Sequence, residues 1–535
     1  MPIKPPRRPV VSSATGRPSG DREPSQSRDP RSARGDQPAR SAPARGPAGP
    51  RSAPYPAAAQ HAPGPRNPVR PEDRTRPAGP VLAADRPAAL YMSCPAGVES
   101  LLAAEAIRIL GAQAQVRESR GGIEVLPPAS ATSPSERHAA LIDYAMRLNL
   151  ESRLAQRVLW RVATRVYRNE DDIYQLARTV NWSDWITPRN TIRVDVTSRR
   201  SHLQSLNFAG LRIKDAVCDD LRDRTGERPD VDTRHPDLGL VLYMDDLDAV
   251  LYVDTSGEAL FKRGWREDTG EAPLKETLAA AMLAAAGWQG RPEDGALLDP
   301  CCGAGTIPIE AAQIACDIAP GLQRRFAFER LLPFKPYEAA WQAIWEAARA
   351  RQRPPRVAIY AGDVAFRMTD FATRNADRAG VRHAIEFKTA DALQRPVPCE
   401  RGVLMFNPPY GERIDVKGSV GNVYRARGDA EEGDEAPATR AGREQFQDEE
   451  ASTFFQRLSS HWKKNYTGWS AWILSPDMKL PSAMRLKESR RVVLFNGPIE
   501  CRLFRFDLVA GSNKRVSAAD ADAASPSTDS KPLES

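Results

Sequence analysis

From about residue 264, segments typical of strands alternate with segments typical of helices. ALLDPCCGAGTIPIEAAQIA (296–315) contains an apolar run, a glycine turn and a helical pattern, and RVAIYAGDVAFRMTDFATRNADRAG (356–380) repeats that order. Two further apolar runs follow in IEFKTADAL (385–393) and GVLMFNPPYG (402–411). Because parallel strands are joined by helical crossovers, residues 265–510 are predicted to form a doubly wound, mainly parallel α/β sheet.

Residues 88–254 mix strand-like and helix-like segments without this regular alternation. GGIEVLP (121–127) is strand-like, NFAGLRIKDAVCDDLRDRTG (207–226) has a helical pattern, and LVLYMDDLDAVLYVDTSG (240–257) predicts two strands around a turn. The mixture predicts an α+β module, or two joined smaller ones, ahead of the α/β domain.

Three segments differ from the rest in composition. Residues 1–80 hold 19 of the 46 prolines and a local charge of +9, so the remaining residues carry −2 of the net +7. Residues 1–87 and 511–535 have too little apolar surface to fold and are predicted to be disordered, and 416–451 to be an exposed, flexible insertion. The basic first segment either attracts polyanions such as RNA or is a solvated extension.

Cysteine and histidine usage bears on the compartment and on metal binding. The seven cysteines lack paired spacing, so no disulfide framework is predicted. Because the chain has no C-x-x-C motif and only six histidines, no zinc site is predicted either. The longest apolar run, Leu278–Trp288, is too short to span a bilayer. The chain is therefore predicted to be soluble and cytoplasmic.

The first strand end of the α/β domain carries candidate binding residues. Asp299 ends the strand, and Gly303 and Gly305 form a turn that lets a ligand approach the backbone. The helix beginning near Thr306 offers free N–H groups to a carboxylate. The spacing is not that of a phosphate-binding P-loop, and a simple tight turn is the alternative.

The next two strand ends also carry acids. Asp363 can accept the hydroxyls of a ribose, and Asp391 can accept from the exocyclic amine of adenine. Each acid taken singly suits a helix cap or a solvated turn. Their order at successive strand ends, which meet at one edge of such a sheet, predicts a nucleoside site.

NPPY (407–410) follows the fourth strand. The two prolines fix their own φ angles and hold Asn407 extended. Asn407 Oδ1 and the Pro408 carbonyl are then acceptors for the two hydrogens of an exocyclic amine, and they stabilise the charge that develops as it attacks a methyl group. Tyr410 offers a face for stacking on a base taken out of its helix.

These residues resemble a class I, Rossmann-like S-adenosylmethionine-dependent methyltransferase that acts on amino groups. FKRGWREDTGEAPLKETLAAAMLAAAGW, LLDPCCGAGTIPIEAA, NPPYGER and NGPIEC together resemble the bacterial 23S rRNA guanine-N2 methyltransferases of the RlmL type. The resemblance covers roughly residues 90–508. It implies a ferredoxin-like piece at 88–140, an RNA-binding THUMP domain at 141–254, and 23S rRNA or a large-subunit assembly intermediate as partner.

The resemblance also implies roles for individual residues. Lys275 and Glu276 match a segment near the cofactor in this family, although a salt-bridged helix start is an equal alternative. The residues assigned to S-adenosyl-L-methionine are Asp299, Cys301, Gly303, Gly305, Thr306, Asp363, Asp391 and Lys275, and those assigned to catalysis on the guanine are Asn407, Pro408, Pro409 and Tyr410.

Three departures from the family pattern affect these expectations. Ala365 stands where the family has a second acid, which weakens the expected ribose contacts. The insertion at 416–451 follows the catalytic loop and is expected to influence RNA access. The family often carries a second, guanine-N7 methyltransferase domain, which is expected to be absent here.

Other functions share parts of this pattern. DNA adenine-N6 and protein glutamine-N5 methyltransferases also use NPPY to place hydrogen-bond acceptors on the amino or amide group that they methylate. The THUMP-like region argues against both. A THUMP-containing tRNA guanine methyltransferase is closer. A noncatalytic RNA-binding assembly factor with a relic cofactor pocket is the alternative from another class, and the presence of Asn407 and Tyr410 argues against it.

Overall fold

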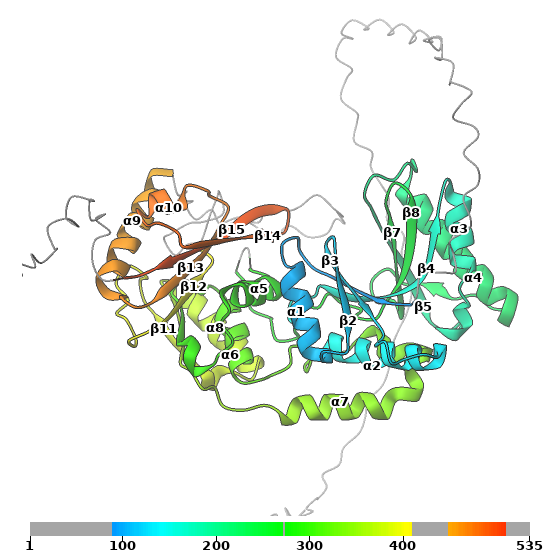
Figure 1. Cartoon of the computed structure of the whole chain (residues 1–535), viewed down its shortest axis with the longest axis horizontal. Helices are drawn as coiled ribbons and strands as arrows, with labels where there is room; N and C mark the ends of the chain where they lie inside the picture. Colours follow the sequence, from blue (N-terminus) through cyan, green and yellow to red (C-terminus); the bar gives the residue numbers. More distant parts are fainter. Residues whose placement is uncertain (1–87, 271–272, 409–447, 510–535) are drawn as a thin grey trace, which may run out of the picture. The chain divides into compact units, whose positions relative to one another are not determined.

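The computed structural model describes residues 88–270, 273–408 and 448–509, which contain two β-sheets (Figure 1). The tails predicted to be disordered, and most of the insertion predicted at 416–451, lie outside these residues. The last residues of that insertion, from Asp448, already belong to helix α9 (Asp448–Asn465). No helix in the described ranges is long and apolar enough to cross a membrane.

The first sheet has eight strands in the order β2-β3-β1-β4-β8-β7-β5-β6. Both predicted pieces, 88–140 and 141–254, contribute strands to it, and residue 140 lies inside helix α2. The strands are β1 (Leu90–Ser93), β2 (Gln115–Ser119), β3 (Gly122–Leu126), β4 (Arg157–Val166), β5 (Thr191–Ser198), β6 (Asp230–Val231), β7 (Leu238–Met244) and β8 (Asp248–Asp254). The helices are α1 (Glu99–Leu110), α2 (Pro134–Glu151), α3 (Glu170–Arg178) and α4 (Leu206–Thr225).

Local sequence explains where these helices begin and end. At the start of α2, the Ser133 hydroxyl accepts from the Glu136 N–H while the Glu136 carboxylate accepts from the Ser133 N–H, and Pro134 occupies the first turn. Helix α4 ends at Gly226, whose φ of 81° is left-handed. The cap of α2 satisfies N–H groups that the start of a helix otherwise leaves free, and the Gly226 N–H donates to the Arg222 carbonyl at the end of α4.

The second sheet has seven strands in the order β11-β10-β9-β12-β13-β15-β14. Its strands are parallel from β11 to β13, and β15 is antiparallel to both β13 and β14. The strands are β9 (Ala296–Asp299), β10 (Ile359–Asp363), β11 (Ile385–Thr389), β12 (Gly402–Phe406), β13 (Ser470–Ser475), β14 (Arg490–Asn496) and β15 (Ile499–Asp507). The helices are α5 (Glu276–Ala286), α6 (Thr306–Ala315), α7 (Glu338–Ala350), α8 (Phe366–Arg378), α9 and α10 (Leu480–Ala483). The predicted doubly wound sheet is confirmed.

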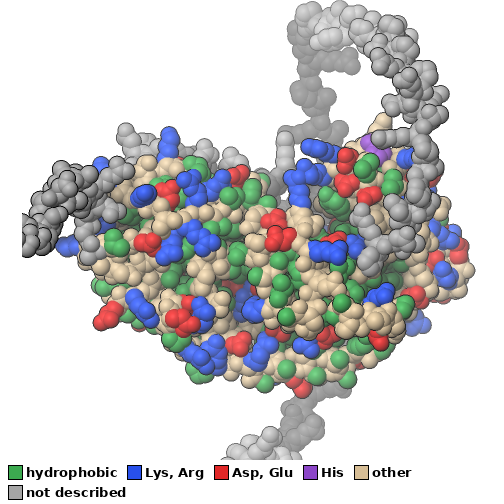
Figure 2. All heavy atoms as spheres, in the orientation of Figure 1, with side chains coloured by type: hydrophobic (Ala, Val, Ile, Leu, Met, Phe, Trp, Pro, Cys, Tyr) green, Lys and Arg blue, Asp and Glu red, His purple; other side chains and the backbone are tan. Residues whose placement is uncertain are grey.

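The charged side chains on the face drawn in Figure 2 are of mixed sign. Lys and Arg side chains are interspersed with Asp and Glu side chains over most of this face. The described part of this face therefore carries no single broad basic surface of the kind that attracts polyanions.

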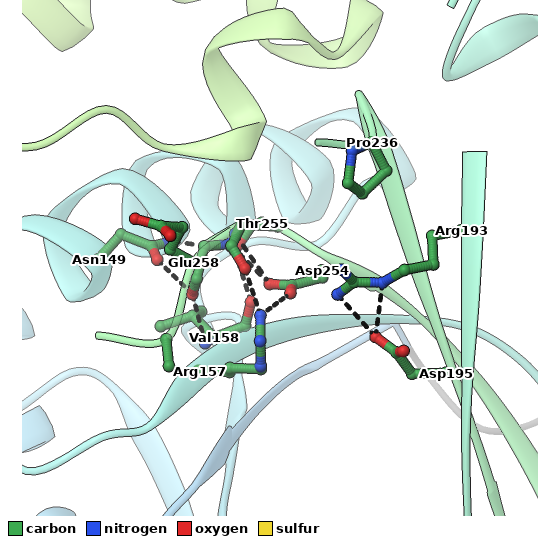
Figure 3. A network of polar contacts seen from close by, with 12 residues as sticks. Asn149, Arg157, Val158, Arg193, Asp195, Pro236, Asp254, Thr255 and Glu258 are labelled. Atoms are coloured by element: carbon green, nitrogen blue, oxygen red, sulfur yellow. Dashed lines mark hydrogen bonds and ion pairs between the residues drawn. The ribbon is translucent and has the colours of Figure 1, made fainter. Parts of the chain in front are cut away.

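The chain leaves the first sheet at Asp254, where a buried polar network holds it (Figure 3). Arg157 forms an ion pair with the Asp254 carboxylate. Asn149 Nδ2 donates to Thr255 Oγ1 over 2.9 Å, and Asn149 Oδ1 accepts from the Ser256 hydroxyl over 2.6 Å. The network fixes the start of the segment between the sheets to α2 and β4.

The same segment is held to α6 farther along the chain. Glu310 of α6 is fully buried, and its carboxylate pairs with Arg263 over 2.9 Å and with Arg153 over 3.1 Å. Arg263 also donates to the Arg153 carbonyl over 2.7 Å. A charged cluster inside the protein thus joins the helix after the glycine turn to the chain that follows α2.

Candidate active site

The centre of the second sheet contains the point where the strand order reverses. Strand β9 has β10 on one side and β12 on the other, and the pairing of Leu298 with Leu404 places the carboxyl ends of β9 and β12 at one edge. Asp299 ends β9, and Asn407 directly follows β12. Ligands of open α/β sheets bind in the crevice outside such ends.

The glycine turn after β9 is held by backbone contacts. Gly303 and Gly305 have φ angles of 52° and 89°, which favour glycine. A Cβ on Gly305 would lie 2.9 Å from the Ala372 side chain, whereas a Cβ on Gly303 would meet nothing within 4 Å. Asp299 Oδ1 accepts from the Cys301 N–H over 3.1 Å. Gly305 is therefore needed for packing on α8, and the backbone at Gly303 faces open space.

The N-terminus of α6 begins at this turn. Thr306 is its first residue, and the Thr306 hydroxyl accepts from Arg266 over 2.7 Å. Arg266 also pairs with the buried Glu276 carboxylate over 2.7 Å. The salt-bridged helix start considered for the PLKE segment is thus present at Glu276, and it links α5 to the first turn of α6.

Asp363 joins two of the strand ends. Its Oδ2 accepts from the Gly303 N–H and its Oδ1 from the Ala365 N–H, both over 3.0 Å. Burial raises the pKa of the Asp363 carboxyl, and these backbone N–H groups oppose the rise. Because a carboxylate has about four acceptor positions, two remain for ligand hydroxyls.

Asp391 follows β11 and is half-buried. Its Oδ1 accepts from the Leu393 N–H over 2.9 Å, and its Oδ2 from the Gln394 amide over 3.3 Å. The pairing of Asp363 with Thr389 places this loop next to the end of β10. The three predicted acids thus follow neighbouring strands at one edge of the sheet.

Asn407 lies at the end of β12 on the other side of the reversal point. Its Oδ1 is buried and has no hydrogen-bond partner among the residues that the structure describes, while Pro408 is buried beside it. The preceding Phe406 is fully buried against Trp462, with ring centroids 5.6 Å apart. Most buried acceptors are paired, so an unpaired amide oxygen at this edge has room for one further hydrogen bond. Pro409 and Tyr410 lie outside the described residues.

Lys275 directly follows Leu274, whose carbonyl accepts from the Thr306 hydroxyl over 3.4 Å. It precedes the first residue of α5, its side chain is exposed, and its Nζ lies 5.2 Å from the centroid of the Phe261 ring. No contact among the described residues joins it to Asp299 or Asp363. Its predicted role at the cofactor remains untested.

Asn375 was not recognised from the sequence. This fully buried residue of α8 donates through Nδ2 to the Ala304 carbonyl over 3.0 Å and to the Asp268 carbonyl over 2.8 Å. It therefore braces the glycine turn against the segment before α5. The only available signal was a polar residue at a position where the helical pattern calls for an apolar one.

Asp299 provides a test of the electrostatics. Burial raises the pKa of its carboxyl well above the ordinary value of 3.8, and neighbouring Asp363 adds to the rise. Between those two pKa values the folded protein binds more protons than the unfolded chain. Stability is therefore greatest below the ordinary pKa and falls as pH rises through the raised pKa.

Asp299→Asn should accordingly raise the midpoint of thermal unfolding of the ligand-free protein at pH 7, because the amide keeps an acceptor for the Cys301 N–H but carries no charge. The gain should shrink as the pH is lowered. Thermal unfolding at pH 7 and pH 5 measures both effects. Asp377 is exposed, so Asp377→Asn serves as the control and should change the free energy of unfolding by no more than about 0.5 kcal/mol. A lower midpoint for Asp299→Asn at pH 7 would contradict the argument.

Two segments of the chain match models of known protein families. Residues 167–254 match the THUMP domain, and residues 263–434 match the RMKL-like methyltransferase domain. The chain carries a THUMP domain followed by an RMKL-like methyltransferase domain. The resemblance predicted from the sequence motifs is confirmed at this level.

Curated proteins that are similar to this chain are named ribosomal RNA large subunit methyltransferase K/L. Those of Shewanella amazonensis and Shewanella pealeana are 35% and 33% identical to the chain over 430 and 435 residues. The matches cover 79% and 80% of this chain and 54% of each relative. The chain thus spans about half the length of these curated relatives.

Two solved structures share the fold. SMU.472 in complex with SAH superposes with a TM-score of 0.64 at 23% identity, covering 80% of this chain and 100% of that one. TrmN from Thermus thermophilus gives a TM-score of 0.51 at 18% identity, covering 79% and 100%. At these identities the likeness concerns the fold alone.

Within the described ranges, no group of three or more His, Cys, Asp or Glu side chains is arranged to hold a metal ion.

Proposed function

We propose that the protein is an S-adenosyl-L-methionine-dependent methyltransferase that methylates the exocyclic N2 of a guanine in 23S rRNA. The observation that carries this proposal is that Asn407 Oδ1, a buried acceptor at the edge where the strand order reverses, has no partner among the described residues. The relatives named ribosomal RNA large subunit methyltransferase K/L support the RNA substrate, and the THUMP domain supports RNA binding.

The residues at the strand ends fit this cofactor. Asp363 retains acceptor positions for the ribose hydroxyls, and Asp391 lies at the next strand end for the adenine amine. The glycine turn and the first N–H groups of α6 suit the methionine carboxylate. The residues proposed to hold the cofactor are Asp299, Cys301, Gly303, Gly305, Thr306, Asp363 and Asp391. When bound, S-adenosyl-L-methionine supplies a methyl group on a sulfonium, which the amine lone pair takes with release of S-adenosylhomocysteine.

The chain contributes acceptors rather than a strong base. A guanine amine is a poor nucleophile because its lone pair is delocalised into the ring. Asn407 Oδ1 and the Pro408 carbonyl accept its two N–H groups and stabilise the positive charge that develops on nitrogen. The proton leaves readily after transfer. Pro409 is proposed to stiffen this step, and Tyr410 to stack on the target base.

Methyl transfer to defined RNAs tests the proposal. The purified chain is incubated with tritium-labelled S-adenosyl-L-methionine and in-vitro-transcribed 23S rRNA, with 16S rRNA and tRNA in parallel, and the RNA is digested to nucleosides. The proposal expects N2-methylguanosine from 23S rRNA. Label only in tRNA would support a tRNA enzyme instead, label in adenine would contradict guanine as the target base, and no label in any RNA would support the noncatalytic alternative.

A further inference from the structure

A cavity of about 310 Å³ lies against the start of α5, and none of the three strand-end acids lines it. Four segments of the chain line it: the loop after β1, the residue before β4, the start of α5, and the tip of the β14–β15 hairpin. Helix α5 contacts both α1 and β14 (Figure 1). The lining residues used below are Gln156, Lys275, Thr277, Phe495 and Asn496.

The charge of this cavity favours an anion. Of the described residues that line it, Lys275 alone carries a formal charge. Its ammonium lies over the Phe261 ring, and no carboxylate in the described ranges forms an ion pair with it. An exposed lysine without a carboxylate partner is available to a phosphate group.

The other lining groups suit a nucleobase. Phe495 is half-buried and offers an aromatic ring, and Gln156, Asn496 and Thr277 offer amide and hydroxyl groups. Aromatic rings stack on bases of any sequence, and side-chain amides pair with base edges. A cation, an aromatic ring and amides in one cavity match the phosphate and base of a single nucleotide.

The cavity lies beyond the same edge of the sheet as the catalytic acceptors. Strand β12 is level with β13 at Phe406 and Ile473, and β15 reaches this level at Phe504. The hairpin tip begins at Ile499, five residues farther in the direction in which β12 ends. At about 3.4 Å per residue the tip lies roughly 17 Å farther along the strand direction than the end of β12, and the intervening strand β13 also displaces it sideways. That separation corresponds to a few nucleotides of an RNA strand.

We propose that this cavity binds a single-stranded nucleotide of the RNA substrate that flanks the target guanine. Lys275 contacts its phosphate, Phe495 stacks on its base, and Gln156 contacts the base edge. The inference rests on the proposed function and adds a second point at which the methyltransferase domain holds the RNA. It gives Lys275 a role on the RNA instead of the one predicted at the cofactor.

Lys275→Gln tests the phosphate contact. Filter binding of in-vitro-transcribed 23S rRNA is measured at several KCl concentrations, and SAH affinity is measured by calorimetry. The slope of log K against log[KCl] should become shallower by about one, because one phosphate contact is lost, while SAH affinity stays unchanged. Lys464→Gln is the matched control: Lys464 is exposed near the end of α9, which precedes β13 and so lies at the opposite edge of the sheet.

Phe495→Leu tests the stacking contact with a side chain that still suits the half-buried position. RNA affinity should fall about tenfold, with the midpoint of thermal unfolding close to that of the parent protein. Equal salt slopes for the parent and Lys275→Gln, or a loss of SAH affinity in that variant, would overturn the cavity proposal. Absence of methyl transfer to 23S rRNA by the parent protein would instead overturn the proposed function.

Discussion

Asn407→Ala is expected to lower kcat for methyl transfer to 23S rRNA by roughly 10²–10³-fold, the loss typical for removal of one preorganised group that stabilises transition-state charge. The Asn407 amide oxygen has no partner among the described residues, so under the proposed function its interaction arises only when the amine is bound. SAH affinity should therefore be retained. Single-turnover transfer of tritiated methyl groups measures the rate, and calorimetry measures the affinity.

The same reasoning separates a catalytic role of Asn407 from a structural one. An unpaired buried acceptor is itself unfavourable by about 1–3 kcal/mol, so Asn407→Ala should unfold at or above the temperature of the parent protein. Asn465→Ala, at the exposed end of α9, is the matched control and should transfer methyl groups at the parental rate. A rate loss in Asn407→Ala that is explained by a lower unfolding temperature would contradict the acceptor role.

The strand-end constellation was predictable because it depends on local order along the chain. A strand, a glycine turn and a helix in sequence place Asp299 at a carboxyl edge, and the repeat of that order places Asp363 at the same edge. The contact that fastens the two ends together, from the Gly303 N–H to Asp363, follows from this topology. Ala365 lacks the acidic side chain that the family pattern has at this position, but the Ala365 N–H still donates to Asp363.

Contacts between distant segments were not predictable in this way. The Arg266–Glu276 pair, the hydroxyl of Thr306 and the brace from Asn375 bring together residues from four separate segments. Strand β2 was also missed, because its side chains are largely exposed and QVRES has no apolar alternation. The joining of the predicted ferredoxin-like and THUMP pieces into one sheet depends on pairing between β1 and β4, which lie far apart in the sequence.

Glu310→Gln is expected to lower the free energy of unfolding by about 3–5 kcal/mol, since it leaves buried guanidinium groups without their counter-charge. Glu310 is fully buried and pairs with Arg263, which is 1% exposed, and with Arg153, which is 12% exposed. Burial lowers the pKa of Arg153, and the Glu310 carboxylate opposes that shift. Urea denaturation followed by tryptophan fluorescence measures the change.

The matched control for this prediction is an ion pair at the surface. Glu338→Gln removes the partner of Lys335, whose pair spans 3.1 Å with Glu338 70% exposed, and should change stability by less than about 1 kcal/mol. Replacing Glu310, Arg153 and Arg263 together by apolar residues of similar volume should recover much of the stability lost in Glu310→Gln, because no buried charge is then left unpaired. Similar small losses for Glu310→Gln and Glu338→Gln would show that the buried cluster does not hold α6 to the chain after α2.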